Sequence, residues 1–327
     1  MISAFYAAVA RRRREWYAAR PESRRRLRHP VISIGNIAAG GRGKTPFAAA
    51  VAQMLIGLGE RPAILSRGYA RTQPEDGAVV VRDAEGIRAD LARSGDEPLM
   101  LARQLPGAIV VACADRFLAG RLAERHLGAT VHVLDDGFQH FQLDRDIDIV
   151  LVSEDDVAGA STFPRGRLRE PADVLVAADA VIIVDGGELP ASHAPSFRAV
   201  RRNGPVVFEA ATDSSQPGRV FAVAGIANPR RFFDALAGAG WVIAGERVFP
   251  DHHAFSPREV REVFSSALTI DAAAVLTTEK DYVRLLPHRP FPMRVGYLPL
   301  TMEPEPREPF RRWLVSSMAA ARDIVLA

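Results

Sequence analysis

The chain has 327 residues, of which 48% are hydrophobic and 25% charged, with a formal net charge of +3. This is the composition of an ordinary globular protein, and the length allows two domains with cores of their own. Cys113 is the only cysteine, which excludes an intrachain disulfide and fits the cytoplasm. No apolar run in the sequence reaches the roughly 18 residues that a membrane-spanning helix needs.

The first 30 residues differ in charge from the rest of the chain. They hold nine arginines and two glutamates, a net charge of +7, so the remainder carries −4. Apolar residues recur among them at helical spacing: Ile2, Phe5, Tyr6, Val9, Trp16 and Tyr17. An apolar stripe beside arginines is typical of a helix lying on an anionic membrane surface. We therefore expect residues 1–30 to form a basic amphipathic segment, with residues 1–28 binding the membrane.

Two other interpretations of this segment stay open. A basic helix packed on the protein itself would show the same pattern. An arm that binds nucleic acid would also be basic, but no nucleic-acid-binding motif accompanies it, so we expect no nucleic-acid partner. A cleaved signal peptide is disfavoured, because the arginines follow the apolar residues instead of preceding them.

Residues 31–58 read as a strand, a glycine-rich loop and a helix in succession. The β-branched run 31–34 suits a buried strand, and the apolar stretch 47–58 suits a helix. The loop between them ends in the residues of a phosphate-binding loop: Gly40, Gly41, Arg42, Gly43, Lys44 and Thr45. Glycines let backbone N–H groups point inward at an anion, and the helix N-terminus adds positive partial charge. Lys44 supplies a charge for the phosphates and Thr45 a hydroxyl for Mg²⁺, so the sequence predicts a nucleotide site.

Two positions depart from known phosphate-loop patterns. Ala38 stands where the usual pattern has glycine, five residues before Gly43. The loop is closer in form to that of MinD-type ATPases, but Ala39 occupies the place of their signature lysine. The strand before the loop and the helix after it still favour a nucleotide site.

Short apolar runs alternate with helical stretches over the next 120 residues. Strand candidates lie at 63–65, 78–81, 108–112, 131–134, 147–152 and 181–184, and helix candidates at 98–104 and 116–126. This alternation predicts an α/β fold over residues 31–205, a doubly wound, mostly parallel sheet of the P-loop NTPase kind with helices on both faces. A second alternating set predicts a smaller α/β domain over residues 206–327.

Polar motifs follow several of these apolar runs directly. The chemistry of open parallel sheets gathers at the carboxyl ends of their strands. Asp135 and Asp136 end the run 131–134, at the place where a P-loop protein carries the acid that holds Mg²⁺. Two adjacent carboxylates facing a polyphosphate would repel it unless a metal ion intervened. We therefore expect the two aspartates to lie at the metal site.

Nine short motifs occur along the chain, in the order SIGNIAAGGRGKTP, SRGYAR, GDEP, ADR, LDDGFQH, GRLREP, AGIANP, FPDHH and TTEKD. Together they resemble the tetraacyldisaccharide 4′-kinase family, the lipid A 4′-kinases, over roughly residues 30–300. The resemblance implies transfer of the γ-phosphate of ATP, with Mg²⁺, to the 4′-hydroxyl of a tetraacylated glucosamine disaccharide 1-phosphate. It places this reaction at the cytoplasmic face of the bacterial inner membrane, in a cleft between two α/β domains. We expect the protein to be a monomer.

The resemblance also implies roles for single residues. Asp96 of GDEP resembles the family's catalytic base, and His252 of the DHH stretch resembles its partner. Lys44 and Thr45 would hold phosphates and metal, and Asp135 and Asp136 would be associated with both. Arg116 would bind the nucleotide, and the further active-site positions are Tyr69, Gln139, Arg169 and Glu170. Asp96 and His252 lie in different predicted domains, so domain closure is expected to bring them together.

Two other functions compete with the lipid kinase. A MinD-like membrane-associated nucleotide switch would use the glycine loop and the basic end, but it would not need GDEP or DHH. A soluble P-loop kinase of a small molecule is the plainer alternative.

Overall fold

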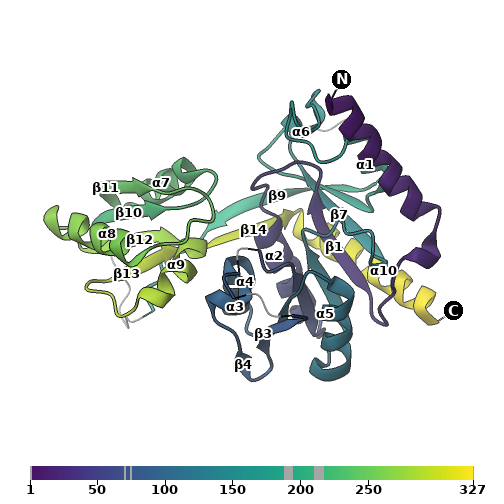
Figure 1. The fold of residues 1–327 in the computed structure, drawn as a ribbon, viewed down its shortest axis with the longest axis horizontal. Coiled ribbons are helices and arrows are strands. Elements are labelled where there is room, and N and C mark those ends of the chain that lie inside the picture. The colour runs from purple at the N-terminus through teal and green to yellow at the C-terminus, as the bar shows by residue number, and fades with distance from the viewer. Residues whose placement is uncertain (1, 70, 74–75, 188–193, 210–216, 327) are drawn as a thin grey trace.

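The structure is a computed structural model, and it describes residues 2–69, 71–73, 76–187, 194–209 and 217–326. These residues form a larger and a smaller α/β unit, which lie side by side (Figure 1). Within the described ranges, every helix is too short or too polar to cross a membrane.

The larger unit is built on a ten-stranded sheet in the order β14-β9-β8-β7-β1-β6-β2-β5-β3-β4. Its strands are β1 (Val31–Asn36), β2 (Pro62–Ser66), β3 (Val79–Asp83), β4 (Gly86–Ile87), β5 (Ile109–Ala112), β6 (Val131–Asp135), β7 (Ile147–Val152), β8 (Ala180–Ile183), β9 (Ser196–Asn203) and β14 (Leu300–Glu305). The seven consecutive strands from β9 to β5 in this order run parallel to one another. At the edges, β14 pairs antiparallel with β9, β3 with β5, and β4 with β3. The predicted mostly parallel α/β sheet is confirmed.

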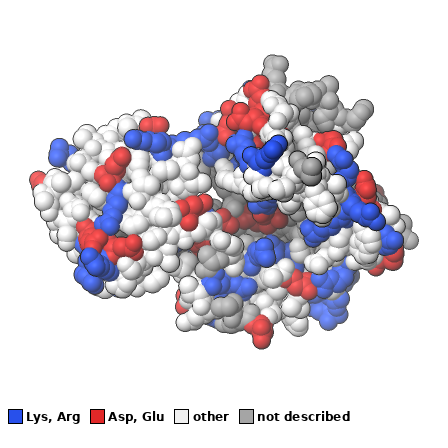
Figure 2. Space-filling model, turned by 45° about the horizontal axis from the view of Figure 1, so that its top comes forward, with Lys and Arg blue, Asp and Glu red and all other residues white. Residues whose placement is uncertain are grey.

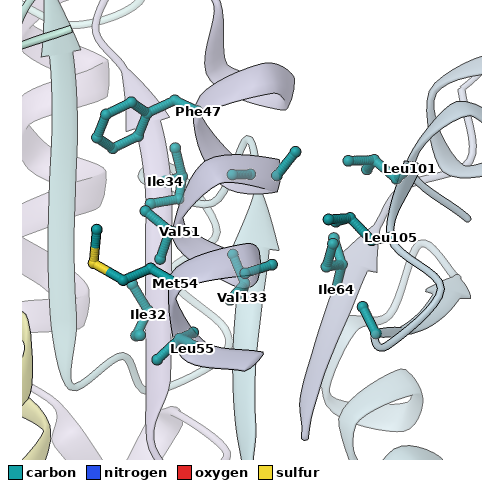
Figure 3. Close-up of a cluster of buried hydrophobic side chains, with 14 of the residues drawn as sticks. Ile32, Ile34, Phe47, Val51, Met54, Leu55, Ile64, Leu101, Leu105 and Val133 are labelled. Carbon is teal, nitrogen blue, oxygen red and sulfur yellow. The ribbon is translucent and has the colours of Figure 1, made fainter. Parts of the chain in front are cut away.

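Helices cover both faces of this sheet. They are α1 (Ile2–Ala18), α2 (Lys44–Gly57), α3 (Leu91–Ser94), α4 (Asp96–Gln104), α5 (Arg116–Leu122), α6 (Glu154–Val157) and α10 (Arg307–Leu326). On one face, Phe47 and Val51 of α2 pack on Ile32 and Ile34 of β1 (Figure 3). A separate hydrophobic cluster holds α5 on the sheet, through residues of β1, β2, β5 and β6 such as Leu65 and Val111. Strands buried on both faces are mostly apolar, which is why they read as nearly continuous apolar runs in the sequence.

The smaller unit has a four-stranded parallel sheet in the order β11-β10-β12-β13. Its strands are β10 (Arg219–Ala224), β11 (Val242–Val248), β12 (Ala274–Thr278) and β13 (Val295–Leu298), and its helices are α7 (Pro229–Gly238), α8 (Pro257–Thr269) and α9 (Glu279–Leu285). Two hydrophobic clusters, one around Phe264 and one around Phe232, hold these helices on the sheet. Ser256 caps α8 in a capping box with Glu259, so this helix begins where its sequence places it.

The end of the chain corrects one part of the predicted domain division. Residues 206–327 were expected to belong to the smaller unit, but residues 300–326 return to the larger one. Here β14 pairs antiparallel with β9 along its whole length, and α10 lies behind the large sheet (Figure 1). The physical reason is burial: Phe310, Leu314 and Met318 form one face of α10 and join the core of the larger unit. The chain therefore passes twice between the units, through β9 and β14. The boundary near residue 205 stays a prediction.

Candidate active site

The phosphate loop connects β1 to α2 at the centre of the large sheet. Lys44 is the first residue of α2, and Gly43 before it adopts a left-handed conformation with φ of 81°. A β-carbon on Gly43 would lie 1.9 Å from Sδ of Met302, so only glycine fits this position. The helix begins without a side-chain cap, which leaves its first N–H groups available to an anion.

Lys44 and Thr45 reach from this helix start to the ends of the neighbouring strands. Lys44 Nζ donates to Asn36 Oδ1 at 3.2 Å and lies 3.5 Å from Asp136 Oδ1. Thr45 Oγ1 donates to Asp135 Oδ2 at 3.0 Å. The structure therefore joins the two halves of the predicted metal site, which are 90 residues apart in the sequence.

Asp135 has the surroundings of a metal-binding carboxylate. Its Oδ1 is buried and has no hydrogen-bond partner among the described residues. Burial, together with the negative charges of Glu97 and Asp136, raises the pKa of Asp135 to about 7. The described residues contain no group of three His, Cys, Asp or Glu side chains placed to hold a metal ion. One or two carboxylates are nevertheless enough for Mg²⁺ when substrate phosphates and water complete its shell, so these residues fit that ion.

Asp136 is held differently from its neighbour. It has a left-handed backbone, with φ of 59°, which turns its side chain toward two cations. Arg169 Nη1 lies 3.0 and 2.9 Å from its two carboxylate oxygens, and Lys44 is the second cation. Burial alone would raise the pKa of Asp136, but the charges of Lys44 and Arg169 lower it below the ordinary value. Asp136 thus stays ionised and orients both cations.

Asp96 and His252 meet across the two units. His252 Nδ1 lies 3.0 Å from Asp96 Oδ2, and Asp96 is only 3% exposed at the first residue of α4. Gly95 before it has φ of 85°, and a β-carbon there would lie 2.5 Å from the carbonyl oxygen of Tyr69, so the chain turns tightly into α4. The Tyr69 ring stands edge-on to His252 with 5.0 Å between ring centroids. The two residues that were expected to meet are in contact in this structure, while the domain closure itself stays a prediction.

Two cations that the sequence analysis did not assign complete this pair. Lys280 Nζ is 3.0 Å from His252 Nε2, and Arg284 donates to Asp96 Oδ2 from Nε at 2.9 Å and from Nη2 at 2.5 Å. Burial would raise the pKa of Asp96, but the hydrogen bond from His252 and the charges of Lys280 and Arg284 lower it far below the ordinary value. The sequence does contain a signal for these two cations. Lys280 directly follows TTE and Arg284 comes four residues later, a spacing that puts both on one face of a helix.

Gln139 and Glu170 form a second group near the loop. Gln139 Nε2 donates to Glu170 Oε2 at 3.0 Å and to the carbonyl oxygen of Asn36 at 2.9 Å. Arg14 of α1 binds Glu170 with two hydrogen bonds of 2.9 and 2.8 Å and stacks on the ring of Phe138. The amino-terminal helix is therefore tied to the active-site motifs, a link that sequence reasoning missed.

The structure gives two predicted nucleotide ligands other partners. Arg42 Nη2 is paired with the buried Asp156 at 2.6 Å, and its backbone N–H donates to Gly40, so its side chain braces the loop from outside. Arg116 is 5% exposed and donates from Nη1 to the carbonyl oxygens of Cys113 and Ala114. Its Nε has no partner among the described residues. Burial lowers the pKa of Arg116, and the charges of Asp135 and Asp136 only partly offset this.

Figure 2 shows that the surface is hollowed where the two units meet, with acidic and basic side chains inside the hollow. The anion-binding loop and the carboxylate pair suited to Mg²⁺ lie at the carboxyl ends of the parallel strands β1 and β6, and the buried Asp–His pair joins the start of α4 to the loop after β11. The fold and this site define a nucleotide-dependent kinase of the P-loop class.

Comparisons with known proteins identify the family. The LpxK family model, described as tetraacyldisaccharide-1-P 4′-kinase, matches residues 1–319. The tetraacyldisaccharide 4′-kinase of Pelobacter propionicus is 38% identical over 296 residues, 87% of this chain and 82% of that protein. That of Desulfatibacillum aliphaticivorans is 34% identical over 97% of this chain and 91% of that protein. A crystal structure of LpxK from Aquifex aeolicus in complex with ATP superposes with a TM-score of 0.81 at 30% identity, over 97% of each chain. The chain belongs to the tetraacyldisaccharide 4′-kinase family.

Proposed function

We propose that this protein transfers the γ-phosphate of ATP to the 4′-hydroxyl of a tetraacylated glucosamine disaccharide 1-phosphate, which forms lipid IVA. The observation that carries this proposal is the 3.0 Å contact between Asp96 and His252, made across the two units in a chain of the 4′-kinase family. An Asp–His pair facing the hollow beside a phosphate loop provides a proton acceptor for an alcohol.

ATP binding is assigned to the loop and its neighbours. The amide groups of Gly40, Gly41 and Gly43 and the ammonium of Lys44 would bind the phosphates. Arg116 adds a buried guanidinium whose Nε has no hydrogen-bond partner within the described ranges. The LpxK of Aquifex aeolicus, which shares the fold, was crystallised in complex with ATP.

Thr45 and Asp135 would hold Mg²⁺, with Asp136 close by. The support is the unpartnered Oδ1 of Asp135 and the hydrogen bond from Thr45, which puts a hydroxyl and a carboxylate together. Mg²⁺ supplies charge neutralisation on the β- and γ-phosphates when it is bound.

The chemistry assigned to the chain is positioning and proton transfer. The acceptor's 4′-oxygen forms a bond to the γ-phosphorus, the bond from that phosphorus to the β,γ-bridging oxygen breaks, and ADP leaves. The hydroxyl proton passes to the Asp96 carboxylate and then to water. Lys44 and Arg116 offset the charge on the phosphates, and His252 orients Asp96 by a hydrogen bond. The exposed Tyr69, together with Gln139, Arg169 and Glu170, is assigned to the acceptor side of the hollow.

A substrate with four acyl chains stays in the bilayer, so the enzyme must work at its surface. The support lies in α1, where Ile2 and Phe5 are 71% and 72% exposed and Val9 is 52% exposed. The protein-facing side of α1 makes ion pairs from Arg11 to Asp173 and from Arg14 to Glu170. It also makes ring contacts, from Tyr6 to Phe163 and from Tyr17 to Phe141. We propose that the apolar side rests on the cytoplasmic face of the inner membrane, and that the protein acts there as a monomer.

The test is transfer of ³²P from [γ-³²P]ATP to the purified disaccharide 1-phosphate in mixed micelles, with water as the competing acceptor. The proposal expects labelled lipid from the native protein and none from K44A. Label found only in inorganic phosphate would instead favour the nucleotide switch. Ala39, at the place of the MinD lysine, already argues against that alternative.

A further inference from the structure

Two cations of α9 enclose the Asp96–His252 pair. Lys280 and Arg284 are four residues apart on this helix and so lie on one face of it. We propose that they are positioning residues. Their contacts make Oδ1 of Asp96 the atom that takes the proton from the hydroxyl group of the lipid substrate. Lys280 does so by fixing the tautomer of His252, and Arg284 by occupying Oδ2. This inference rests on the proposed function, because it names the reacting atom of the proposed base.

Lys280 determines which nitrogen of His252 carries hydrogen. Its Nζ lies 3.0 Å from His252 Nε2, and an ammonium group has three donors and no acceptor. The Nε2 atom must therefore be the acceptor, which leaves the hydrogen of the neutral ring on Nδ1. That nitrogen is 3.0 Å from Asp96 Oδ2, so the ring donates to the carboxylate. Lys280 is held in place by Glu97 Oε1 at 3.2 Å and Asp251 Oδ1 at 3.6 Å.

Arg284 is fixed by a buried network inside the smaller unit. Its Nη1 donates to the carbonyl oxygen of Gly225 at 2.8 Å and to Asp281 Oδ1 at 2.7 Å. The other oxygen of Asp281 accepts from the N–H of Gly225 at 2.9 Å and from Thr278 at 2.7 Å. Asp281 is fully buried and Arg284 is 5% exposed. The smaller unit therefore fixes the orientation of the Arg284 guanidinium that faces Asp96.

The two carboxylate oxygens of Asp96 are consequently unequal. Oδ2 accepts three hydrogen bonds, one from His252 and two from Arg284. Oδ1 accepts one, from the N–H of Glu97 at 2.8 Å. A carboxylate oxygen has about two lone-pair sites, so Oδ1 keeps one for a new donor while Oδ2 has none left. The acceptor's hydroxyl must approach Oδ1.

This arrangement has a consequence for pH. The titratable and charged groups that face His252 are Asp96 from α4, Lys280 from α9, Asp251 from its own loop and Tyr69 from the loop after β2. Lys280 is the cation that sits on the nitrogen that would take a second proton, while Arg284 of α9 binds the same oxygen of Asp96 as the ring does. Removing Lys280 leaves Nε2 available to a proton from solvent. An imidazolium beside Asp96 would make the carboxylate a poorer proton acceptor.

The primary test reads the tautomer without any reaction. In ¹⁵N-histidine-labelled protein, two-bond ¹H–¹⁵N correlation spectra identify which ring nitrogen of His252 carries hydrogen, with H252N to assign the signal. We expect the Nδ1–H form in the native protein and in K280R. In K280M, where no ammonium group faces Nε2, we expect ring signals that differ from those of the native protein. An Nε2–H form in the native protein would overturn the proposal, as would a K280M spectrum identical to the native one.

The second test is kinetic. We expect K280M and R284M to lower kcat by about 10- to 100-fold with KM for ATP changed less than about twofold. The loss in K280M should deepen as the pH falls, and K280R should recover most of the activity. If Arg284 acts through Asp96, D96N/R284M should transfer phosphate no more slowly than D96N. A double variant slower by the full R284M factor contradicts this.

The matched control is Q104A. Gln104 makes another contact between α4 and α9, to Glu279 Oε2 at 2.7 Å, at the far end of the same interface. If Q104A lowers kcat as much as K280M and R284M, loosening of the interface explains the effect and the proposal fails. R284K keeps a cation if R284M does not fold. Absence of lipid phosphorylation by the native protein would reject the proposed function, whereas the tautomer measurement would still decide the role of Lys280.

Discussion

Gly43 of the phosphate loop lies directly against Met302 of β14, so closely that a β-carbon on the glycine would be 1.9 Å from the methionine sulfur. Met302 is fully buried, and β14 is one of the two strands that link the two units. The floor of the nucleotide site is thus built by a residue more than 250 positions away in the sequence.

This contact predicts that Met302 supports the loop. M302A should lower the free energy of unfolding by about 2–5 kcal/mol, because it leaves a cavity under the loop, and it should also raise KM for ATP. M302L conserves volume and should cost less than about 1.5 kcal/mol. Chemical denaturation and ATP titration measure both effects. Equal ATP affinity in M302A and the native protein would show that the loop does not depend on this support.

The Asp96–His252 contact predicts a joint role in one step. D96A should lower kcat by about 10²–10⁴-fold, the range for a lost general base. H252A should act on the same step, so the double variant should lose less than the product of the two single losses. Single-turnover measurements separate this step from product release. Strictly multiplicative losses would mean that the two residues act independently.

Asp135 is predicted to set the metal requirement. D135N should raise the Mg²⁺ concentration for half-maximal activity at least about tenfold, since a neutral amide is a poorer ligand for a hard cation. Chelation by EDTA should abolish transfer in the native protein, and added Mg²⁺ should restore it. D155N is the matched control, because the side chain of Asp155 is 80% exposed and makes only weak surface pairs. The same shift in D155N would indicate a general effect of charge.

The apolar side of α1 is predicted to bind membranes. The double variant F5S/V9S should weaken binding to anionic liposomes by more than about tenfold, because it removes two exposed apolar side chains, each worth up to about 1.5–3 kcal/mol when buried. V242S, at a residue 54% exposed on β11 of the smaller unit, should bind as the native protein does. Liposome co-sedimentation measures both. If deletion of residues 2–28 left binding and lipid phosphorylation intact, the membrane role of this segment would be wrong.

Glu279 predicts a pH dependence of stability. Burial raises the pKa of Glu279 from 4.5 to about 7, although Gln104 and Arg103 act in the opposite direction. The folded protein therefore holds this proton more tightly than the unfolded chain. The stabilising effect of the protonated Glu279 side chain is fully present below pH 4.5. As the pH rises toward 7, the free energy of unfolding falls by at most about 3 kcal/mol. In E279Q the free energy of unfolding should vary less over this range, as followed by urea denaturation at several pH values. An unchanged pH profile in E279Q would contradict the prediction.

The sequence alone determined the features that neighbouring residues encode. The strand, glycine loop and helix of residues 31–57 form as predicted, because a buried β-branched run, turn glycines and an apolar helix face are local patterns. The parallel sheet follows from the alternation of such units. The acids Asp135 and Asp136 were found for the same reason: they stand directly after a strand, and parallel strands bring their carboxyl ends to one edge.

Only the tertiary structure decided what depends on the path of the chain. Asp96 is 156 residues from His252 and 188 from Arg284. No local propensity predicts that His252 and Arg284 bind the same carboxylate oxygen of Asp96. The return of β14 and α10 to the large sheet was equally hidden, since an apolar helix face does not say which sheet it will cover. The pairing of Arg42 with Asp156 was also hidden, because a buried carboxylate's need for a partner arises only once the chain has folded.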